Sequence, residues 1–516
     1  MSPKPAHRDG PVTLPTAALS AASVSPGAGT AEGAVALPSG SPSLGRLTVP
    51  RVRIVVGPLA GRIALASIVL GVLAVVAFAT AGPSVLVPRS DEVFPLWEAG
   101  PLHALFGGLP NSQLTLAYGL SGLLVLMAVA YGVVVAAARS LSMRAIVITV
   151  LAIHALLLLS APLQLTDVFN YIGYARLGAL HHLNPYTHVI GGEVHDPIYR
   201  FATWHNLHSP YGPLFTAATY LLPVGSLSVS YWLLKTVTVL ASLAFLALLW
   251  RCALNLGRDP RVVVALVALN PIYMIYAVGG FHNDFFMLVP STAAIALLTA
   301  PVREGMDTKW RDLGVGGVLM LAVAVKFTAI LLLPFLLVAA GSRARASRIA
   351  IGAVLGAIPL AALSLAVFGL SLPNLQDQST LLTAFSIPNV VGLALGVGGG
   401  TPLLLRIADV AVVGIVVLLL ADRIGRRGDW VSRAGWATLA LIASLAWLMP
   451  WYLIWLAPLA ALGASPALRR AFLGLTAFLV LTFMPATGIY FANHGIDPMA
   501  TPAGHASSKL QHKLSR

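Results

Sequence analysis

The sequence predicts an all-α polytopic membrane protein, and three observations lead to this fold class. Hydrophobic residues make up 58% of the 516 residues and charged residues only 10%, against roughly 45–50% and 25% in soluble proteins. Apolar runs of about 18 to 22 residues, enough to cross the hydrocarbon core of a bilayer, recur along the chain. Lys and Arg residues lie mainly in short loops between these runs, as in cytoplasmic loops beside anionic lipid. The formal charge of +14 therefore predicts contact with membrane lipids and no nucleic-acid partner.

The chain divides into a tail, a transmembrane domain and a second tail. Residues 1–55 are mostly Pro, Ala, Ser, Gly and Thr, which cannot offset the entropy of ordering, so we expect a disordered cytoplasmic tail. Residues 56–490 are expected to form the transmembrane domain, and residues 491–516 a polar C-terminal tail. The clear spans are expected at 63–82, 113–137, 144–161, 228–250, 261–279, 284–301, 349–369, 402–421, 432–449 and 470–488.

Three further segments complete the expected topology. Residues 313–340 would measure roughly 42 Å as one helix and carry Lys326 in the middle, so we expect two short spans that turn near Lys326. Residues 450–464 give another short span. Residues 211–225 are read as non-crossing or re-entrant, because a crossing would place the basic loop from Arg258 to Arg261 outside. The total is about 13 transmembrane helices, the parity of which is the least secure part.

Placing the basic loops in the cytoplasm predicts a multi-pass plasma-membrane protein whose unusual polar residues face outside. The expected outer segments are 83–112, 162–212, the turn from Gly279 to Asp284, 370–390 and the corner at Pro450. The single cysteine, Cys252, excludes an internal disulfide and a metal site built from cysteines.

An acidic and aromatic stretch begins where an apolar run ends, at Asp167. If this stretch is helical, Asn170, Tyr171 and Tyr174 follow Asp167 at spacings of three, four and seven, so all four share one face. Arg176 falls off that face, and we expect the helix to lie in the membrane interface. We interpret Asp167 as a catalytic base; the alternative, that it caps its helix, is compatible with that role.

Six histidines lie in the same outer segment, together with Glu193 and Asp196: His181, His182, His188, His195, His205 and His208. Neither a His-x-x-x-His pair on a recognisable helix nor His-Glu-x-x-His occurs there. We therefore expect surface or hydrogen-bonding histidines, no metal site and no cofactor, although the nearby acids and imidazoles leave a divalent metal open.

Two other interruptions of apolar sequence carry polar groups. In the turn Gly279-Gly280-Phe281-His282-Asn283-Asp284, either Asn283 or Asp284 is a possible cap for the next helix. The same groups are suited to hydrogen bonds with sugar hydroxyls, or to supplying a second carboxylate. Lys326 is costly inside an apolar run and marks a functional site, with a lipid phosphate as its expected partner; the alternative is snorkelling to the interface.

Aromatic residues cluster around Pro450, namely Trp447, Trp451, Tyr452 and Trp455. An aromatic belt at the membrane surface explains them as well as stacking on sugar rings does.

A series of short motifs spanning residues 160–460 resembles the GT-C membrane glycosyltransferases that use polyprenyl-phosphate sugars. The greatest similarity is to the actinobacterial polyprenyl-phosphomannose-dependent α-1,6-mannosyltransferases of lipomannan and lipoarabinomannan synthesis. Each motif is weak alone and their order carries the resemblance: Asp167-Val168-Phe169-Asn170-Tyr171 with Arg176, Asn184-Pro185-Tyr186, Tyr211-Gly212-Pro213-Leu214, Asn270-Pro271, Gly280-x-His282-Asn283-Asp284, Lys326-Phe327-Thr328 and Pro450-Trp451-Tyr452.

The resemblance implies a GT-C-like bundle with a large outer loop that carries interfacial helices and the active site. It implies a polyprenyl-phosphate sugar donor, a glycolipid or lipoglycan acceptor, and Asp167 as the base of an inverting transfer, with mannose and the α-1,6 linkage resting on the resemblance alone. The candidate substrate-binding residues are Asn170, Tyr171, Tyr174, Arg176, Asn184, Tyr186, Tyr211, His282, Asn283, Asp284, Lys326, Trp451 and Tyr452.

This chemistry agrees with the residue types. An inverting transfer needs one base for the acceptor hydroxyl and cationic groups where the leaving phosphate gains charge, for which Arg176 and Lys326 are candidates. A leaving phosphomonoester has no pyrophosphate to bridge, so the reaction does not require a metal. This chain departs from the family pattern because two further apolar spans, absent from the minimal fold, precede the span that leads into the catalytic loop. Asp91-Glu92, in the preceding outer loop, is therefore a rival acidic pair. The alternative functions are a transporter or flippase for a lipid-linked sugar, or a non-catalytic assembly subunit.

Overall fold

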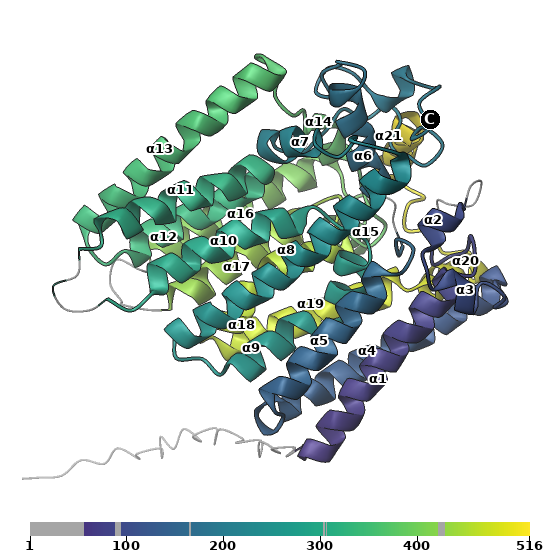
Figure 1. Ribbon diagram of the computed structural model, residues 1–516, viewed down its shortest axis with the longest axis horizontal. Helices are drawn as coiled ribbons and strands as arrows, with labels where there is room; N and C mark the ends of the chain where they lie inside the picture. The colour runs from purple at the N-terminus through teal and green to yellow at the C-terminus, as the bar shows by residue number, and fades with distance from the viewer. Residues whose placement is uncertain are drawn as a thin grey trace, which may run out of the picture. The chain divides into compact units, whose positions relative to one another are not determined.

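The computed structural model describes residues 56–87, 94–164, 167–302, 305, 307–421 and 429–515. The described residues form helices joined by short loops (Figure 1), with one isolated β-bridge between Ser84 and Val87 and no strand among them. All described helices belong to one compact unit. The expected disordered tail at residues 1–55 lies outside the described residues.

Within the described ranges, six helices are long and apolar enough to cross a membrane. They are α1 (Pro58–Ala79), α4 (Gln113–Ala137), α8 (Leu227–Asn255), α13 (Arg343–Phe368), α16 (Pro402–Ala421) and α19 (Pro466–Phe483). A further pair, α9 (Pro260–Ala268) and the π-helix η3 (Ile272–Val278), is bent by 54° and together passes the same test. All of these coincide with expected spans, which confirms an all-α polytopic membrane protein; the total of about 13 stays a prediction.

Shorter helices complete the structure. The apolar ones are α5 (Met143–Leu158), α10 (Asp284–Thr299), α11 (Lys309–Val325), α12 (Leu333–Ala339), α17 (Trp430–Ser444) and α18 (Leu453–Leu462). The remaining ones are α2 (Leu96–Ala99), α3 (His103–Phe106), α6 (Asp167–Ala179), α7 (Pro213–Thr219), α14 (Gln376–Thr380), α15 (Ile387–Ala394), α20 (Pro485–Asn493) and α21 (Pro502–Ser515), with the 3-10 turns η1 (Ala138–Ser140), η2 (Ile190–Gly192), η4 (Phe327–Leu332) and η6 (Pro450–Tyr452).

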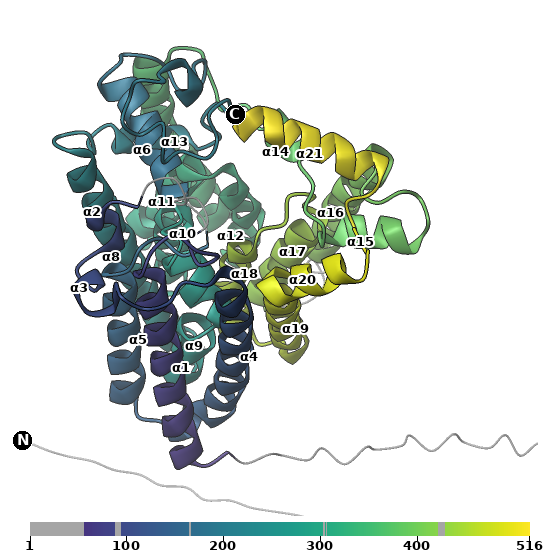
Figure 2. The same ribbon diagram turned by 90° about the vertical axis from the view of Figure 1, so that its right-hand side faces the viewer.

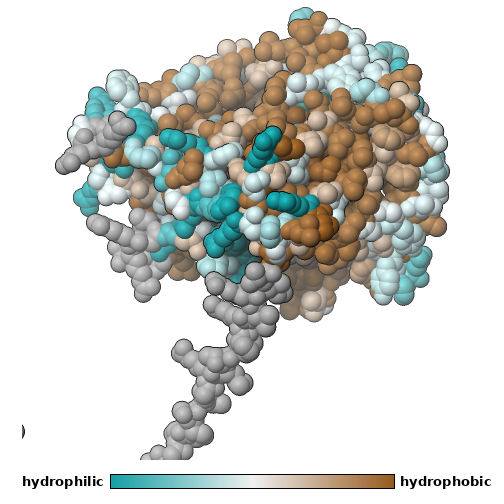
Figure 3. Space-filling view, turned by 60° about the horizontal axis from the view of Figure 1, so that its bottom comes forward, coloured by the Kyte–Doolittle hydropathy of each residue, from teal (hydrophilic) through white to brown (hydrophobic). Residues whose placement is uncertain are grey.

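The surface of the helical bundle is suited to lipid. A broad band of hydrophobic residues crosses the face shown in Figure 3, with hydrophilic residues gathered on either side of it. Helix α16 illustrates the reason, because none of its 20 residues is buried although its mean hydropathy is 2.7. An apolar surface of this extent is unfavourable in water and favourable in a bilayer.

The chain reverses direction near Lys326, as the sequence predicted. Helix α11 ends at Val325, and Lys326 has extended backbone angles of φ −151° and ψ 118° before η4 and α12 follow. Arg345, at the start of α13, binds both Asp312 near the start of α11, at 2.8 Å, and the carbonyl oxygen of Ala340 just after α12, at 3.2 Å. The start of α11 and the end of α12 therefore lie at the same end of the bundle.

Helix α7 explains the segment at 211–225. It has seven residues, about 10 Å of helix, which is far too short to cross a membrane. This length agrees with the expectation of a non-crossing or re-entrant segment.

The C-terminal segment is folded, whereas the sequence analysis expected only a polar tail at 491–516. Helix α21 lies near α14 in both ribbon views (Figure 1 and Figure 2). The Ser507 hydroxyl accepts a hydrogen bond from the Leu382 amide at 2.7 Å, and the Leu514 carbonyl accepts one from the Asn206 amide at 2.9 Å. Leu514 also packs with Leu207 and Leu381 in a small separate core. The low average hydropathy of the segment hides this single apolar stripe.

Glycines allow α11 and α13 to approach closely. A Cβ atom added to Gly316 would lie 2.0 Å from the Ile349 carbonyl oxygen, and one added to Gly352 would lie 2.0 Å from the Leu313 carbonyl oxygen. Small residues at such positions let helix backbones pack together in an apolar solvent, where van der Waals contact drives association.

Alanine at Gly316 should therefore destabilise the bundle, whereas alanine at Gly314 in the same helix should not. The nearest atom to a Cβ at Gly314 is Cδ1 of Leu297 at 3.7 Å, an ordinary contact. Overpacking costs about 1–3 kcal/mol, so the melting temperature of purified Gly316→Ala protein in detergent should fall by several degrees. Equal melting temperatures for the two variants would contradict the close packing.

Candidate active site

The carboxylate of Asp167 faces the imidazole of His282. Asp167 is the first residue of α6, and its Oδ2 lies 3.4 Å from Nδ1 of His282. The side chain of His282 is 1% exposed and that of Asp167 is 16% exposed, so the acid keeps an open side. The His282 ring stacks on Trp451, with centroids 3.8 Å apart and planes inclined by 10°. The arrangement holds an imidazole at a fixed place beside an accessible carboxylate.

A second acid and a lysine form an ion pair next to this one. Oδ1 of Asp284 accepts hydrogen bonds from Nζ of Lys326 at 2.6 Å and from Nε1 of Trp455 at 2.5 Å. The ammonium group of Lys326 also lies over the rings of Trp455, at 4.8 Å, and Tyr452, at 5.1 Å. The side chain of Asp284 is fully buried, whereas that of Lys326 is 21% exposed. Lys326 therefore presents a fixed positive charge at an accessible position.

These contacts bear on two alternatives that the sequence left open. Asn283 is the N-cap residue of α10, but its side chain makes no capping hydrogen bond, and Asp284 binds Lys326 and Trp455. The polar turn is therefore more than a helix cap. The ammonium group of Lys326 has partners within the protein, because it binds Asp284 and lies over two aromatic rings.

Tyr171 joins the two pairs. Its hydroxyl accepts a hydrogen bond from the backbone amide of Asn283 at 3.3 Å, and the edge of its ring meets Tyr211 at a centroid distance of 4.9 Å. Burial, together with the negative charges of Asp167 and Asp284, raises the pKa of Tyr171 well above its ordinary value of 10.0. The phenol stays protonated at neutral pH and keeps a hydrogen to donate.

The other predicted residues of α6 anchor the loop that follows this helix. Oδ1 of Asn170 accepts hydrogen bonds from the backbone amides of Thr203 and Trp204 at 3.1 and 3.0 Å. The Tyr174 hydroxyl donates to the Leu207 carbonyl at 2.9 Å. The helix is confirmed, but the face that was expected to bind substrate is divided. Asp167 and Tyr171 belong, with His282, Asp284 and Lys326, to one group of contacting residues, here called the acid–lysine cluster. Asn170 and Tyr174 instead anchor residues 203–207.

Arg176 also binds a residue of the loop, namely Asp196. Its Nε binds both carboxylate oxygens of Asp196, at 2.8 and 3.1 Å, and the same carboxylate contacts Nε2 of His181 at 2.7 Å. Burial opposes ionisation of Asp196, but the hydrogen bonds from Arg176 and His181 outweigh it and leave its pKa below the ordinary value of 3.8. The structure thus places Lys326, and not Arg176, in the acid–lysine cluster.

Asn184 and Tyr186 connect the loop to the rest of the bundle. The Asn184 amide donates to the Phe368 carbonyl, at the end of α13, at 2.9 Å. The Tyr186 hydroxyl donates to the Tyr211 carbonyl at 2.8 Å, and its ring packs on Phe368. Both residues therefore position Tyr211 and α13 without joining the cluster.

His205 and His188 make hydrogen bonds within the loop, as expected. His205 binds the Tyr199 carbonyl at 2.8 Å and stacks on its ring, while His188 contacts the Thr187 hydroxyl at 3.0 Å. No group of three or more His, Cys, Asp or Glu side chains suited to a metal occurs in the described ranges. The rival pair Asp91-Glu92 lies outside the described residues.

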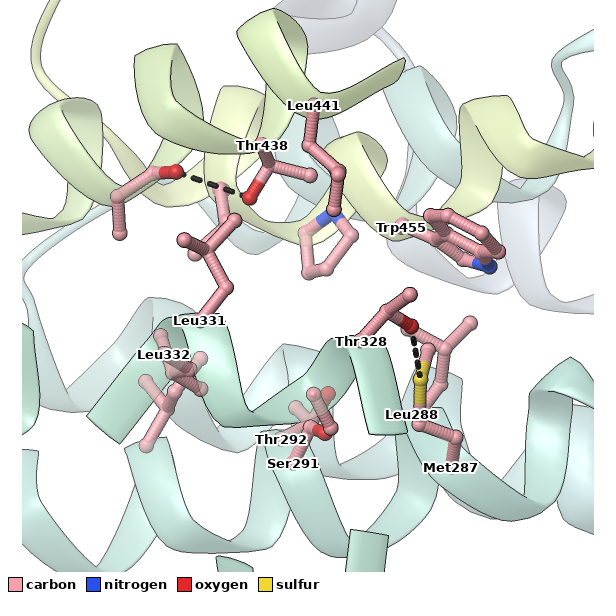
Figure 4. Close-up of a pocket in the computed structure, with 15 residues that line it drawn as sticks. Met287, Leu288, Ser291, Thr292, Thr328, Leu331, Leu332, Thr438, Leu441 and Trp455 are labelled. Carbon is pink, nitrogen blue, oxygen red and sulfur yellow. Dashed lines mark hydrogen bonds between the residues drawn. The ribbon is translucent and has the colours of Figure 1, made fainter. Parts of the chain in front are cut away.

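A narrow pocket begins beside the Asp284–Lys326 pair and was not predicted from the sequence. Figure 4 shows it between α10 and η4 on one side and α17 and α18 on the other, with Trp455 at one end. Trp455 lines this pocket and also binds Asp284. The labelled residues are Met287, Leu288, Ser291, Thr292, Thr328, Leu331, Leu332, Thr438, Leu441 and Trp455. The only signal in the sequence was the position of Trp455 in the aromatic cluster.

Two family models match the parts of the chain that contain the acid–lysine cluster and the aromatic residues around Pro450. Residues 68–342 match the family model described as alpha-(1->6)-mannopyranosyltransferase, N-terminal domain, and residues 380–504 match the one described as MptB C-terminal domain. The chain is 30% identical over 370 residues to alpha-(1->6)-mannopyranosyltransferase A of Mycobacterium tuberculosis, covering 64% of this chain and 67% of that protein. It is 28% identical over 346 residues to alpha-(1->6)-mannopyranosyltransferase B of Corynebacterium glutamicum, covering 59% and 56%. No solved structure matches.

Breaking the Arg176–Asp196 contact should loosen the outer loop by the same amount from either side. A carboxyl whose pKa is lower in the folded loop stabilises it above the ordinary pKa of 3.8, and this stabilisation is lost as the pH falls through the folded value. At pH 7, Asp196→Asn and Arg176→Gln should each speed hydrogen exchange in residues 190–209, and the double variant should add little to either. Wild-type protein should approach the Asp196→Asn exchange rate only below about pH 4. Additive effects in the double variant would contradict the pairing.

Proposed function

This chain belongs to the alpha-(1->6)-mannopyranosyltransferase family, and we propose that it transfers mannose from a polyprenyl-phosphate donor to a growing cell-envelope glycolipid or lipoglycan in α-1,6 linkage. The observation that carries this proposal is the meeting of an accessible carboxylate, Asp167, with an accessible ammonium group, Lys326, across a single buried turn that holds His282 and Asp284. Glycosyl transfer from a phosphate needs one group of each sign: a base for the nucleophile and a cation for the leaving group.

Asp167 acts as the base in this proposal. Its carboxylate takes the proton of the acceptor hydroxyl while the oxygen attacks the anomeric carbon, and the bond from that carbon to the phosphate oxygen breaks on the opposite face with inversion. His282, fixed on Trp451 and 3.4 Å from Asp167, orients the carboxylate. A β-linked donor then gives an α-linked product.

Lys326 stabilises the negative charge that the leaving phosphate gains. Asp284 and Trp455 hold Lys326 in place before the donor arrives, so little reorganisation accompanies the reaction. The protonated phenol of Tyr171, between the two acids, is a neutral hydrogen-bond donor for a sugar or phosphate oxygen.

The pocket beside Trp455 suits the hydrocarbon chain of the donor. Its lining includes Leu288, Leu331 and Leu441, and Trp455 separates it from the Asp284–Lys326 pair (Figure 4). A chain bound there keeps its phosphate next to Lys326, which gives the polar and apolar parts of the donor adjoining sites.

The direction of the helices supports a site that faces outside. Helix α5 follows Arg139 and leads to Asp167, and α9 follows Arg258 and leads through η3 to the turn that carries His282. Basic residues thus begin the helices whose other ends form the cluster, as expected when the cluster lies opposite the cytoplasm.

Asp167→Asn should abolish mannosyl transfer without changing the amount of folded protein in the membrane. Loss of a general base costs about 10²–10⁴ in rate, and the amide keeps the size of the side chain. The assay incubates purified protein with polyprenyl-phosphomannose and a lipoglycan acceptor in detergent, where a transporter or flippase would show no turnover. Asp377→Asn in α14 is the matched control and should transfer normally. Full activity of Asp167→Asn would refute the assignment of the base.

Filling the pocket should weaken binding of long-chain donors selectively. Ser291 lines the pocket, and a phenylalanine there displaces about two CH₂ groups of a bound chain, worth about 0.8 kcal/mol each. Ser291→Phe should raise KM about tenfold for a long polyprenyl donor and leave KM for a short-chain, water-soluble analogue unchanged. Ala411→Phe on the exposed face of α16 is the control. An equal rise for both donors would place the hydrocarbon chain elsewhere.

A further inference from the structure

A second lysine is buried directly behind the active-site turn. The side chain of Lys235, in α8, has no exposed surface, and its Nζ donates a hydrogen bond to the Ser160 carbonyl oxygen at 2.5 Å. The same amino group lies over three aromatic rings, at 4.0 Å from the centroid of Trp232, 4.7 Å from that of Tyr231 and 4.8 Å from that of Phe281. Lys235 is therefore enclosed among aromatic rings.

A buried acid from another part of the chain interacts with Lys235. Glu98, in α2, is fully buried and interacts electrostatically with Lys235. Helix α2 is held to α8 by hydrogen bonds from the Tyr231 hydroxyl to the Glu98 carbonyl at 3.2 Å and from Nε1 of Trp232 to the Trp97 carbonyl at 3.0 Å. These hydrogen bonds fix α2 beside the two residues whose rings face Lys235.

Ser160, Tyr231, Trp232 and Phe281 surround the amino group of Lys235 and are called the cage. One side of the cage contacts the turn that carries His282. Phe281 precedes His282, is fully buried, and has φ +52°, a left-handed conformation that a non-glycine residue adopts only when its surroundings impose it. The ring of Phe281 is what Lys235 contacts. Holding that ring in the cage keeps the backbone in the conformation that directs His282 toward Asp167.

Another side of the cage contacts the start of α6. Tyr231 stacks on Phe169, two residues after Asp167, with centroids 5.7 Å apart and planes inclined by 11°. The Ser160 carbonyl that Lys235 binds begins the segment leading into α6, and the Leu163 amide in that segment donates to the Gly279 carbonyl of the turn at 2.9 Å. Lys235 therefore contacts both segments that supply the Asp167–His282 pair.

We propose that Lys235 is a positioning residue, which sets the separation of Asp167 and His282 by binding the α6 segment and the active-site turn to one buried side chain. The inference rests on the proposed function, because it assigns Lys235 to the geometry of that site. Lys235 does not contact substrate, since its side chain is fully buried. Its effect on the reaction passes through Phe281 and Ser160, and the donor-binding groups Lys326 and Trp455 are outside the cage.

The kinetic test uses Lys235→Met in the whole chain, since methionine keeps most of the length of the side chain and removes the amino group that makes these contacts. We expect kcat to fall about 30-fold while KM for the polyprenyl-phosphomannose donor changes less than twofold, because the catalytic pair is displaced and the donor site is intact. Lys309→Met, which removes a lysine lying 5.6 Å from Trp310 at the start of α11, is the matched control and should be unchanged. An unchanged kcat in folded Lys235→Met protein would overturn the inference.

A double-variant cycle separates positioning from a general loss of stability. In a His282→Ala background, Lys235→Met should lower kcat by less than threefold further, because the group that it positions is already absent. A full 30-fold further loss would overturn the inference. Should Lys235→Met fail to fold, Phe281→Leu, which keeps the lysine and removes the ring of the turn, should give the same kcat loss and the same coupling to His282.

Hydrogen exchange gives a readout that does not depend on sugar transfer. In the folded protein the Phe281 amide donates to Val278 and the His282 amide donates to Ala277, at 3.1 and 3.3 Å. Lys235→Met should speed exchange of these two amides at least tenfold, and Lys309→Met should leave them unchanged. Absence of transfer by the wild-type protein would refute the proposed function alone, whereas unchanged exchange in Lys235→Met would refute the positioning role alone.

Discussion

The ion pair between Asp284 and Lys326 is the contact on which the rest of the site depends. It joins the first residue of α10 to the residue that ends α11, and through Trp455 it also fixes α18. A carboxylate and an ammonium group are each costly in an apolar bundle, and removing either leaves the other as an uncompensated charge. The pair therefore holds the chain at the point where α11 stops and the chain reverses. It also determines which end of the bundle carries polar groups.

Breaks in the helices, and not the helices themselves, supply the reactive groups. Asp167 follows the end of α5, His282 and Asp284 follow the π-helical turn η3, and Trp451 lies in the 3-10 turn η6 before α18. Each break frees backbone groups that must be satisfied within the protein, because lipid cannot bind them. The hydrogen bonds from Leu163 to Gly279 and from Asn283 to Tyr171 meet this need while drawing the separate breaks together.

Hydropathy and isolated polar residues predicted the spans, the reversal at Lys326 and the central members of the cluster. Asp167, Asp284 and Lys326 were identifiable because charge is rare in such sequence, and rarity does not depend on the fold. The partners of Arg176 were not identifiable, because Asp196 is one of several acids in an irregular loop whose path is set by Asn170 and Tyr174. Lys235 was passed over inside an expected span, since its cage is assembled from residues 160, 231, 232 and 281.

The two lysines of this site differ in exposure, and their proposed roles follow from that difference. Lys326 and Lys235 each have a carboxylate neighbour and aromatic rings within about 5 Å of the ammonium group. The side chain of Lys326 is 21% exposed, so a phosphate can share its charge, whereas Lys235 is fully enclosed and can act only on the protein around it. A cation that reaches the substrate supplies electrostatic stabilisation, and one that does not supplies geometry. The proposed transferase needs both, because a base at the correct distance is useless without a stabilised leaving group, and the converse holds equally.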